Sequence, residues 1–216
     1  MSINIAIDGP AGAGKSTIAK KVAQDKGYIY IDTGAMYRAI GYYAVNNSVD
    51  MDDDEAVSNM CNNTDITIAY IDGEQNIFLN GENINIYIRT NEASQMASIV
   101  AKNPIVREKL VELQKKLAKE NNVVMDGRDI GTCVLPNAQI KIYLTASSDV
   151  RAKRRQDELL LKGIEIDFNA MKKEIDDRDY SDMHREFSPL MQAEDAILID
   201  TSYMTIDEVV RKIVGM

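Results

Sequence analysis

One glycine-rich segment carries the residue types that bind phosphate. Residues 9–16 match the pattern G-x-x-x-x-G-K-[ST]. Its glycines let the backbone curl, so that successive N–H groups point at phosphate oxygens. We expect Lys15 to reach the β- and γ-phosphates of a nucleotide and the Ser16 hydroxyl to ligate Mg²⁺. The predicted nucleotide-binding residues of this loop are Gly9, Pro10, Ala11, Gly12, Ala13, Gly14, Lys15, Ser16 and Thr17.

The segments beside this loop have the character that a phosphate-binding loop requires. Residues 3–7 are apolar and short enough to be a strand, and residues 18–23 have a helical pattern. A helix that begins near Lys15 adds the positive end of its dipole to the site. A glycine-rich turn that only packs is the alternative, and the agreement of loop, lysine, hydroxyl and flanking elements disfavours it.

Two other predicted strands end in polar residues. The strand at 28–31 leads into Thr33, a predicted helix N-cap, and Arg38, one turn further on. The strand at 122–125 leads into Asp126 and Arg128. Ligands of open α/β sheets lie at the carboxyl ends of the strands, so both arginines should lie near the loop, and Asp126 should contact Mg²⁺ through water. A solvated Arg38, or an Arg128 ion pair with Asp126 or Asp129, is the alternative.

Two groups of charged residues recur at helical spacing in the second half of the chain. They are Arg178, Asp182 and Arg185, at i, i+4 and i+7, and Arg151, Arg154 and Arg155, at i, i+3 and i+4. Each group would share one face of a helix. Guanidinium groups suit phosphate oxygens and the charge of a transferring phosphoryl group, although a charged helix face is often only solvated.

The order of the predicted elements favours an α/β fold with a five-stranded parallel sheet flanked by helices. Further strands are expected at 139–144 and 196–199, and a final helix at 205–214. An antiparallel meander is expected over 65–88, with turns at Asp72-Gly73 and Asn80-Gly81 and a third strand through Ile84 and Ile86. Helices should follow at 90–101 and 104–120.

Composition excludes several functional classes. The 216 residues carry a net charge of -9, which argues against nucleic-acid and anionic-membrane partners. Cys61 and Cys133 lack metal-binding spacing, and His184 is the single histidine, which excludes a histidine-based triad. The sequence shows no apolar run near the ~18 residues of a membrane span and no leader pattern, so we expect a cytoplasmic protein.

Five segments resemble the bacterial cytidylate kinases, a family of P-loop nucleoside monophosphate kinases. The resemblance spans nearly the whole chain, and the Asp-Gly-Arg-Asp-x-Gly-Thr segment is specific to that family among P-loop kinases. The matching segments are residues 7–10, 32–38, 88–90, 126–132 and 185–190.

The resemblance implies ATP-dependent phosphorylation of CMP and dCMP, with Mg²⁺, by a monomer. It implies one kinase domain over 1–216, with its core at about 1–31, 121–148 and 183–216. The nucleoside monophosphate (NMP) region, which includes the meander, would be 32–120, and a short helical lid would be 149–182. Within the lid, 151–165 would close over ATP, and Arg154 would contact it.

The resemblance also implies roles for individual residues on the acceptor side. The acceptor nucleotide would be held by Thr33 and Arg38, and the cytosine would be read by Ser98, Arg107 and Asp129. Phosphates would be held by Arg128 and Arg185, and the sugar would be contacted by Arg178 and Asp182. Lys15, Arg128 and Arg185 would form the catalytic set.

Two other functions stay open at this point. A P-loop kinase of another small acceptor, such as UMP, AMP or a non-nucleotide, would share most of these features. A GTP-binding switch would require an Asn-Lys-x-Asp motif and a D-x-x-G motif, and the sequence contains neither.

The expected base specificity gives a first prediction. Cytosine offers an amino donor and a ring acceptor where uracil offers a carbonyl and an N–H, while a carboxylate only accepts and a guanidinium only donates. The kcat/KM for CMP should therefore greatly exceed that for UMP. Asp129→Ala should lower activity on CMP more than on UMP and so shrink the ratio. An unchanged ratio, measured with both acceptors, would mean that the base is read elsewhere.

Overall fold

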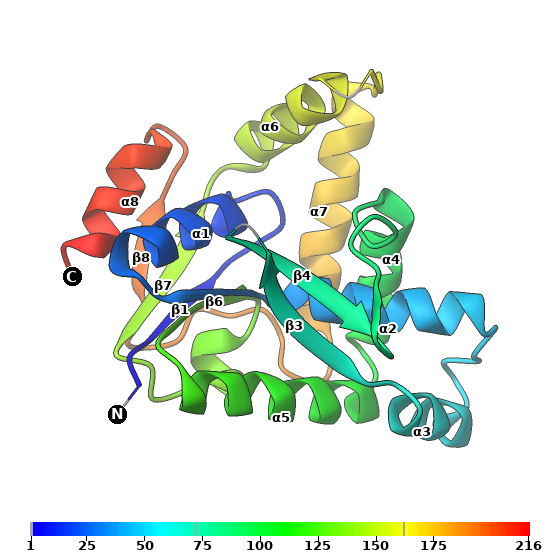
Figure 1. The fold of residues 1–216 in the computed structure, drawn as a ribbon. Coiled ribbons are helices and arrows are strands. Elements are labelled where there is room, and N and C mark those ends of the chain that lie inside the picture. Colours follow the sequence, from blue (N-terminus) through cyan, green and yellow to red (C-terminus); the bar gives the residue numbers. More distant parts are fainter. Residues whose placement is uncertain (1, 72, 162) are drawn as a thin grey trace. The chain divides into compact units, whose positions relative to one another are not determined.

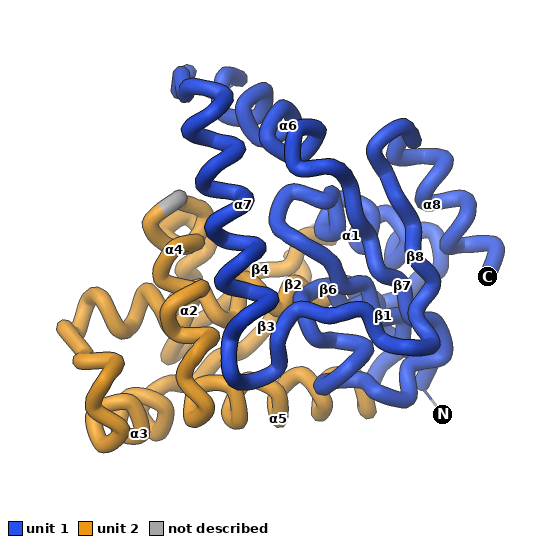
Figure 2. Tube along the Cα trace, turned by 180° about the vertical axis from the view of Figure 1, so that it is seen from behind, with its two compact units in different colours: residues 1–30, 121–216 blue, residues 31–120 orange. Residues whose placement is uncertain are grey.

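The computed structural model describes residues 2–71, 73–161 and 163–216 (Figure 1). It divides the chain into two compact units, unit 1 with residues 1–30 and 121–216 and unit 2 with residues 31–120 (Figure 2). The limits of unit 2 lie within one residue of those expected for the NMP region. That residues 1–216 act as one kinase domain stays a prediction.

A five-stranded parallel sheet is the centre of the fold, as predicted. Its strand order is β2-β6-β1-β7-β8, with β1 pairing in parallel with β6 and β7, and β7 with β8. The chain leaves β1 toward one edge and later crosses to the other, so β1 and β6 flank the switch point where such sheets bind ligands. The strands are β1 (Asn4–Asp8), β2 (Ile29–Asp32), β6 (Val123–Gly127), β7 (Ile140–Thr145) and β8 (Ile197–Asp200).

Two helices of unit 1, α1 (Lys15–Lys26) and α8 (Ile206–Val214), pack side by side on the sheet (Figure 1). Ile18 and Val22 of α1 and Val210 of α8 join the strand residues in one buried apolar core. Burial of this apolar surface at about 25 cal/mol per Å² is the main force that holds α1, and hence the loop before it, on the sheet.

The predicted charged helical segment forms a pair of helices, α6 (Ser148–Leu161) and α7 (Phe168–His184). They share a small apolar core of their own, built from Ala152, Leu159, Met171 and Ile175. A short π-helix, η1 (Ile130–Val134), follows β6, and the sequence analysis did not predict it.

The described residues of unit 2 form four helices and a three-stranded antiparallel sheet in the order β3-β4-β5. Helix α2 packs on α4 and α5, and α3 packs on α5. The elements are α2 (Thr33–Asn46), α3 (Asp54–Asn62), β3 (Ile66–Ile71), β4 (Glu74–Leu79), β5 (Glu82–Asn83), α4 (Asn91–Val100) and α5 (Pro104–Glu120).

The meander differs from its prediction in one strand. The Asn-Gly turn is present, with φ of 50° at Asn80 and 84° at Gly81, as a two-residue hairpin requires. The third strand ends at Asn83. Ile84 still donates its N–H to the Ile77 carbonyl at 3.1 Å, but a turn over 85–87 replaces the rest of the predicted strand, because Asn85 bonds to β4 through its side chain. The other predicted turn includes Asp72, which lies outside the described residues. The sequence analysis also missed α3, whose N-cap is Asp53.

Two glycines with positive φ should respond differently to substitution. Gly27 ends α1 at φ 67° with open space around it, so Gly27→Ala should cost about 1 kcal/mol of unfolding free energy from backbone strain alone. Gly9, at φ 147°, abuts Leu144, whose carbonyl oxygen a Cβ would overlap. Gly9→Ala should therefore cost considerably more than Gly27→Ala.

Urea unfolding of both variants measures this difference. Gly27→Asn is the control, because asparagine tolerates the left-handed region, and it should lose less stability than Gly27→Ala. Equal losses at Gly9 and Gly27 would contradict the close approach to Leu144.

Candidate functional site

The predicted phosphate loop joins β1 to α1 and has the backbone that the motif requires. Gly12 and Gly14 have φ of 74° and 86°, and Gly14 is the N-cap of α1. Position 9 must be a glycine, because a side chain there would overlap Leu144, as described above. Lys15, Ser16 and Thr17 form the first turn of the helix.

The Lys15 ammonium group is buried under the loop. The residue is 6% exposed, and its Nζ donates to the carbonyl oxygen of Pro10 at 2.7 Å. Burial, and next the charge of Arg128, lower the pKa of Lys15 to about 7. The carboxylate of Asp126 opposes this shift. An arriving phosphate would supply the negative charge that this cation lacks.

Ser16 and Asp126 lie together, as the sequence analysis expected of a metal site. The Oγ of Ser16 donates to Oδ2 of Asp126 at 2.8 Å, and the Tyr30 hydroxyl donates to Oδ1 at 2.9 Å. Hydroxyl and carboxylate oxygens are the ligands that Mg²⁺ prefers. No group of three or more His, Cys, Asp or Glu residues in the described part of the chain could hold a metal. A hydroxyl oxygen and a carboxylate oxygen fit an ion that takes its other ligands from water and phosphate.

Arg128 has a different partner from those considered above. Its Nε donates to Oδ2 of Asp182 at 2.7 Å, which joins the end of β6 to α7. Burial alone would raise the pKa of Asp182, but the charge and hydrogen bond of Arg128, and then the charge of Arg178, lower it. Asp182 is therefore a stable anion that holds the guanidinium group.

Arg185 does not share a helix face with Arg178 and Asp182. Helix α7 ends at His184, and Arg185 is its C-cap with extended backbone, at φ -67° and ψ 146°. Its Nη2 lies 3.4 Å from Oδ1 of Asp129, and its Nε donates to the Ser188 carbonyl at 2.6 Å. The structure thus places Arg185 beside Asp129 through the chain that follows the helix.

The loop is clamped by a buried ion pair that joins α6 and α7. The N–H of Ala11 donates to Oδ1 of Asp179 at 3.2 Å, and the Ala11 carbonyl accepts from Nη1 of Arg151 at 2.9 Å. Arg151 and Asp179 also pair with each other. Arg151 lies so close to the loop that a Cβ at Gly12 would be 3.2 Å from the Arg151 Cβ.

The three arginines of α6 therefore have separate partners. Arg154 donates to the Thr201 hydroxyl at 3.1 Å and to the Thr201 carbonyl at 2.7 Å, and Arg155 pairs with Glu158 on its own helix. They share a spacing but do not form the expected common cluster. A role of Arg154 toward ATP stays a prediction.

In unit 2, Arg38 is held by the residue that caps its helix. Asp32, not Thr33 as predicted, is the N-cap of α2: its Oδ1 accepts from Ala35 N at 2.9 Å. Its Oδ2 accepts from Nη2 of Arg38 at 2.9 Å. The Nε of Arg38 is buried without a hydrogen-bond partner among the described residues. Thr33 is the first helical residue and is buried.

The remaining acceptor residues of unit 2 lie on α4 and α5. Ser98, on α4, is partly exposed, and its Oγ donates to the Ser94 carbonyl at 3.4 Å. Arg107, on α5, is 5% exposed, and its guanidinium carbon lies 5.8 Å from the ring centre of Tyr37. A cation at this distance from a ring centre is attracted to the face of the ring.

Comparison with known proteins identifies the family. The model for cytidylate kinases matches residues 5–216. The chain belongs to the cytidylate kinase family. A cytidylate kinase of Caldicellulosiruptor bescii is 53% identical over 214 residues, which cover 99% of this chain and 95% of that protein. One of Bacillus subtilis is 51% identical over 211 residues, which cover 98% and 94%.

A solved structure shows a similar fold. It belongs to an uncharacterized protein from Eubacterium ventriosum and gives a TM-score of 0.52 at 14% identity, covering 100% of this chain and 97% of that one. The chain is a nucleoside monophosphate kinase by its family. In the described part of the chain, no helix is both long and apolar enough to cross a membrane.

Sequence reasoning missed the contacts of three buried aspartates in this member of the cytidylate kinase family, two of which lie on α7 and pair with arginines. The buried face of α7 runs from Met171 and Ile175 to Asp179 and Asp182, so an apolar stripe continues as carboxylates. These carboxylates pair with Arg151 and Arg128, so the change from apolar to acidic residues along the stripe was the sequence signal for the two pairs. Asp8 is the other omission. It stands at the end of a buried strand, directly before the loop.

Asp8 holds the segment that carries Asp129. Its two carboxylate oxygens accept from the N–H groups of Ile130 and Gly131, at 2.8 and 2.7 Å. Asp8 is 4% exposed, and burial, the largest cause, raises its pKa to about 6. The two N–H groups oppose that shift. The carboxylate therefore changes its charge in a mildly acidic range.

The raised pKa of Asp8 predicts a pH dependence of stability. Between about 3.9, the pKa of an unfolded Asp, and about 6, the folded protein binds more protons than the unfolded chain. The contribution of Asp8 to the free energy of unfolding thus falls as pH rises through this window. Asn does not titrate, so the stability of Asp8→Asn relative to the unsubstituted protein should increase from about pH 4 to about pH 7.

Urea unfolding at both pH values measures this change. A constant offset between the two proteins reports the lost hydrogen bond and is not part of the prediction. Parallel stability curves across the window would contradict the raised pKa.

Proposed function

We propose that this kinase transfers the γ-phosphoryl group of ATP to CMP and dCMP, giving ADP with CDP or dCDP. An acceptor phosphate oxygen attacks the γ-phosphorus, and the bond from that phosphorus to the β,γ-bridging oxygen breaks. The attacking oxygen is already ionised, so the step needs no strong general base. The observation that carries the proposal is the Ser16–Asp126 hydrogen bond at 2.8 Å below a phosphate loop with a buried lysine.

On the ATP side, the backbone of residues 9–14 and Lys15 would cradle the β- and γ-phosphates. Burial, and then the charge of Arg128, lower the pKa of Lys15, so added phosphate charge favours its protonated form. The protonated ammonium group would stabilise the charge that develops on the phosphoryl oxygens.

Ser16 and Asp126 would hold Mg²⁺, Ser16 directly and Asp126 through water. When bound, Mg²⁺ would supply positive charge to the phosphate oxygens and favour their in-line geometry. Tyr30 keeps the Asp126 carboxylate oriented through its hydrogen bond to Oδ1.

On the acceptor side, Arg38, Arg128 and Arg185 would hold phosphate groups, and Thr33 would assist Arg38. Each arginine is kept in place by a carboxylate, from Asp32, Asp182 and Asp129 respectively. Such pairs orient the guanidinium groups before the substrate binds, which reduces the entropic cost of positioning.

Ser98, Arg107 and Asp129 would read the cytosine, and Arg178 and Asp182 would contact the sugar. The contact of Arg107 with Tyr37 supports a fixed guanidinium plane, as discrimination of a base edge requires. A wrong base would leave buried polar groups without matched partners.

Helices α6 and α7 would act as the lid that closes over ATP and excludes water. Their own apolar core lets them move as one piece, and the pair of Arg151 and Asp179 ties their base to Ala11 of the loop. Exclusion of water prevents transfer of the phosphoryl group to solvent.

ADP production across a panel of CMP, dCMP, UMP and AMP tests this proposal. CMP and dCMP should be the best acceptors. Lys15→Met should lower kcat by about 10³-fold or more while the thermal unfolding temperature changes little.

Each other outcome has a definite meaning. A near-normal kcat in Lys15→Met would remove Lys15 from the chemistry. Preference for UMP or AMP would change the acceptor. Slow ATP hydrolysis without stimulation by any acceptor would indicate a nucleotide-binding switch instead.

A further inference from the structure

A buried amide on the antiparallel sheet of unit 2 bonds to the N-cap residue of helix α2. Gln75, on β4, is 9% exposed and bonds to both main-chain groups of Asp32. Its Oε1 accepts from Asp32 N at 2.8 Å, and its Nε2 lies 3.4 Å from Asp32 O. The side chain thus bonds the end of β2 much as a neighbouring strand would.

Asp32 carries this constraint to Arg38. One carboxylate oxygen caps α2 at Ala35 N, and the other accepts from Nη2 of Arg38, both at 2.9 Å. The main chain of Asp32 must be fixed for both bonds to form at once. Gln75 bonds this main chain from β4, outside β2 and α2.

The state of Arg38 indicates what this arrangement prepares. The guanidinium group makes one bond to Asp32, while its buried Nε has no hydrogen-bond partner in the described part of the chain. A buried donor without a partner costs free energy, so it is expected to serve a ligand. An anion such as the acceptor phosphate matches this group.

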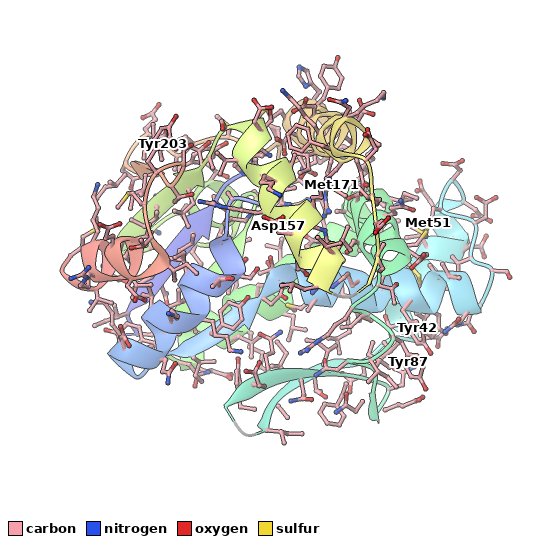
Figure 3. All side chains as sticks on the ribbon, turned by 90° about the horizontal axis from the view of Figure 1, so that it is seen from above. Tyr42, Met51, Tyr87, Asp157, Met171 and Tyr203 are labelled. Atoms are coloured by element: carbon pink, nitrogen blue, oxygen red, sulfur yellow. The ribbon has the colours of Figure 1, made fainter. Side chains whose placement is uncertain are left out.

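The rest of the meander braces Gln75. Asn85 donates from Nδ2 to the Gln75 carbonyl at 3.3 Å, and its Oδ1 accepts from Ile77 N at 3.0 Å. Tyr87 then stacks on Tyr42 of α2, with ring centres 5.4 Å apart; Figure 3 labels both rings, which lie side by side. Tyr87 follows the sheet, which ends at Asn83, so its ring joins the chain after β5 to α2, whereas the Gln75 contact leads through Asp32 to Arg38.

We propose that Gln75 is a positioning residue for the acceptor phosphate, acting through Asp32 on Arg38. The inserted sheet thereby sets the affinity of the kinase for its acceptor without touching it through Gln75. This inference rests on the proposed role of Arg38 in binding the acceptor phosphate.

Gln75→Leu tests the inference, because leucine has a similar size and makes neither bond to Asp32. The KM for CMP should rise about tenfold, because a misplaced Arg38 would lose about one hydrogen bond to the acceptor phosphate. The KM for ATP and the kcat at saturating CMP should change less than about threefold. Should Gln75→Leu fail to fold, Gln75→Glu keeps the acceptor for Asp32 N, loses the Nε2 donor and should shift the KM for CMP in the same direction.

Ile77→Val is the matched control on the same strand. Ile77 lies two residues from Gln75 and is fully buried, so the lost methylene should lower the unfolding temperature while the bonds to Asp32 remain. If Gln75 only stabilises the sheet, both Gln75→Leu and Ile77→Val should lower the unfolding temperature. The two variants should then have the same KM for CMP. That result would overturn the inference.

A double-mutant cycle with Arg38→Met separates the inference from the proposed function. Arg38→Met alone should raise the KM for CMP strongly, and adding Gln75→Leu should then raise it no further. Additive effects would show that Gln75 acts by another route. An unchanged KM in Arg38→Met would overturn the role of Arg38 and the inference with it, whereas a raised KM without an effect of Gln75→Leu would overturn the inference alone.

Discussion

The burial of a cation beside other cations is the constraint on which unit 1 depends. Lys15 is enclosed beneath the phosphate loop, and its burial, followed by the charges of Arg128 and Arg178, lowers its pKa. Asp126 and Asp182 supply the opposing attraction. Burial of an unbalanced charge is among the most costly changes a protein can undergo. The ends of β6 and α7 must therefore stay together for the loop to keep its lysine, and the same balance leaves the site short of negative charge until phosphate binds.

The aspartates meet this constraint by two kinds of contact. Asp182 pairs with a guanidinium group, whereas Asp8 accepts two main-chain N–H groups and so fixes the π-helix that follows Asp129. Asp179 does both, because it pairs with Arg151 and accepts from Ala11 N. Removing one member of such a buried pair typically costs about 3–5 kcal/mol, because the other charge remains without compensation. The geometry of the loop is thus set by acidic residues that the phosphate-binding motif does not include.

What the sequence could predict follows the range of each interaction. The phosphate loop, the five strands and the Asn-Gly turn depend on residues close together in the chain, and their positions were confirmed within a residue or two. The N-cap of α2 was wrong by one residue because Asp32 and Thr33 are both good caps, and the second role of Asp32 toward Arg38 decides between them. The spacing of charged residues on α6 predicted a common face but not the partners. Those partners, such as Thr201 for Arg154, come from distant strands and helices.

The partners of each arginine divide the structural ones from those suited to phosphate. Arg151 donates from Nε to the Ala146 carbonyl, and its Nη1 bonds to the Ala11 carbonyl and to Asp179, so these donors already hold the loop to α6 and α7. Arg154 likewise donates from both terminal nitrogens to Thr201. Arg38 instead uses Nη2 alone on a carboxylate and keeps a buried Nε without a partner among the described residues. One carboxylate bond fixes the direction of a guanidinium group, and the remaining donors stay available for an anion, since the group carries five N–H bonds in a rigid plane. Family resemblance ranks Arg38 and Arg154 alike as ligand-binding residues, but this count of donors favours Arg38, and Arg154 would have to give up its bonds to Thr201 before it could bind ATP.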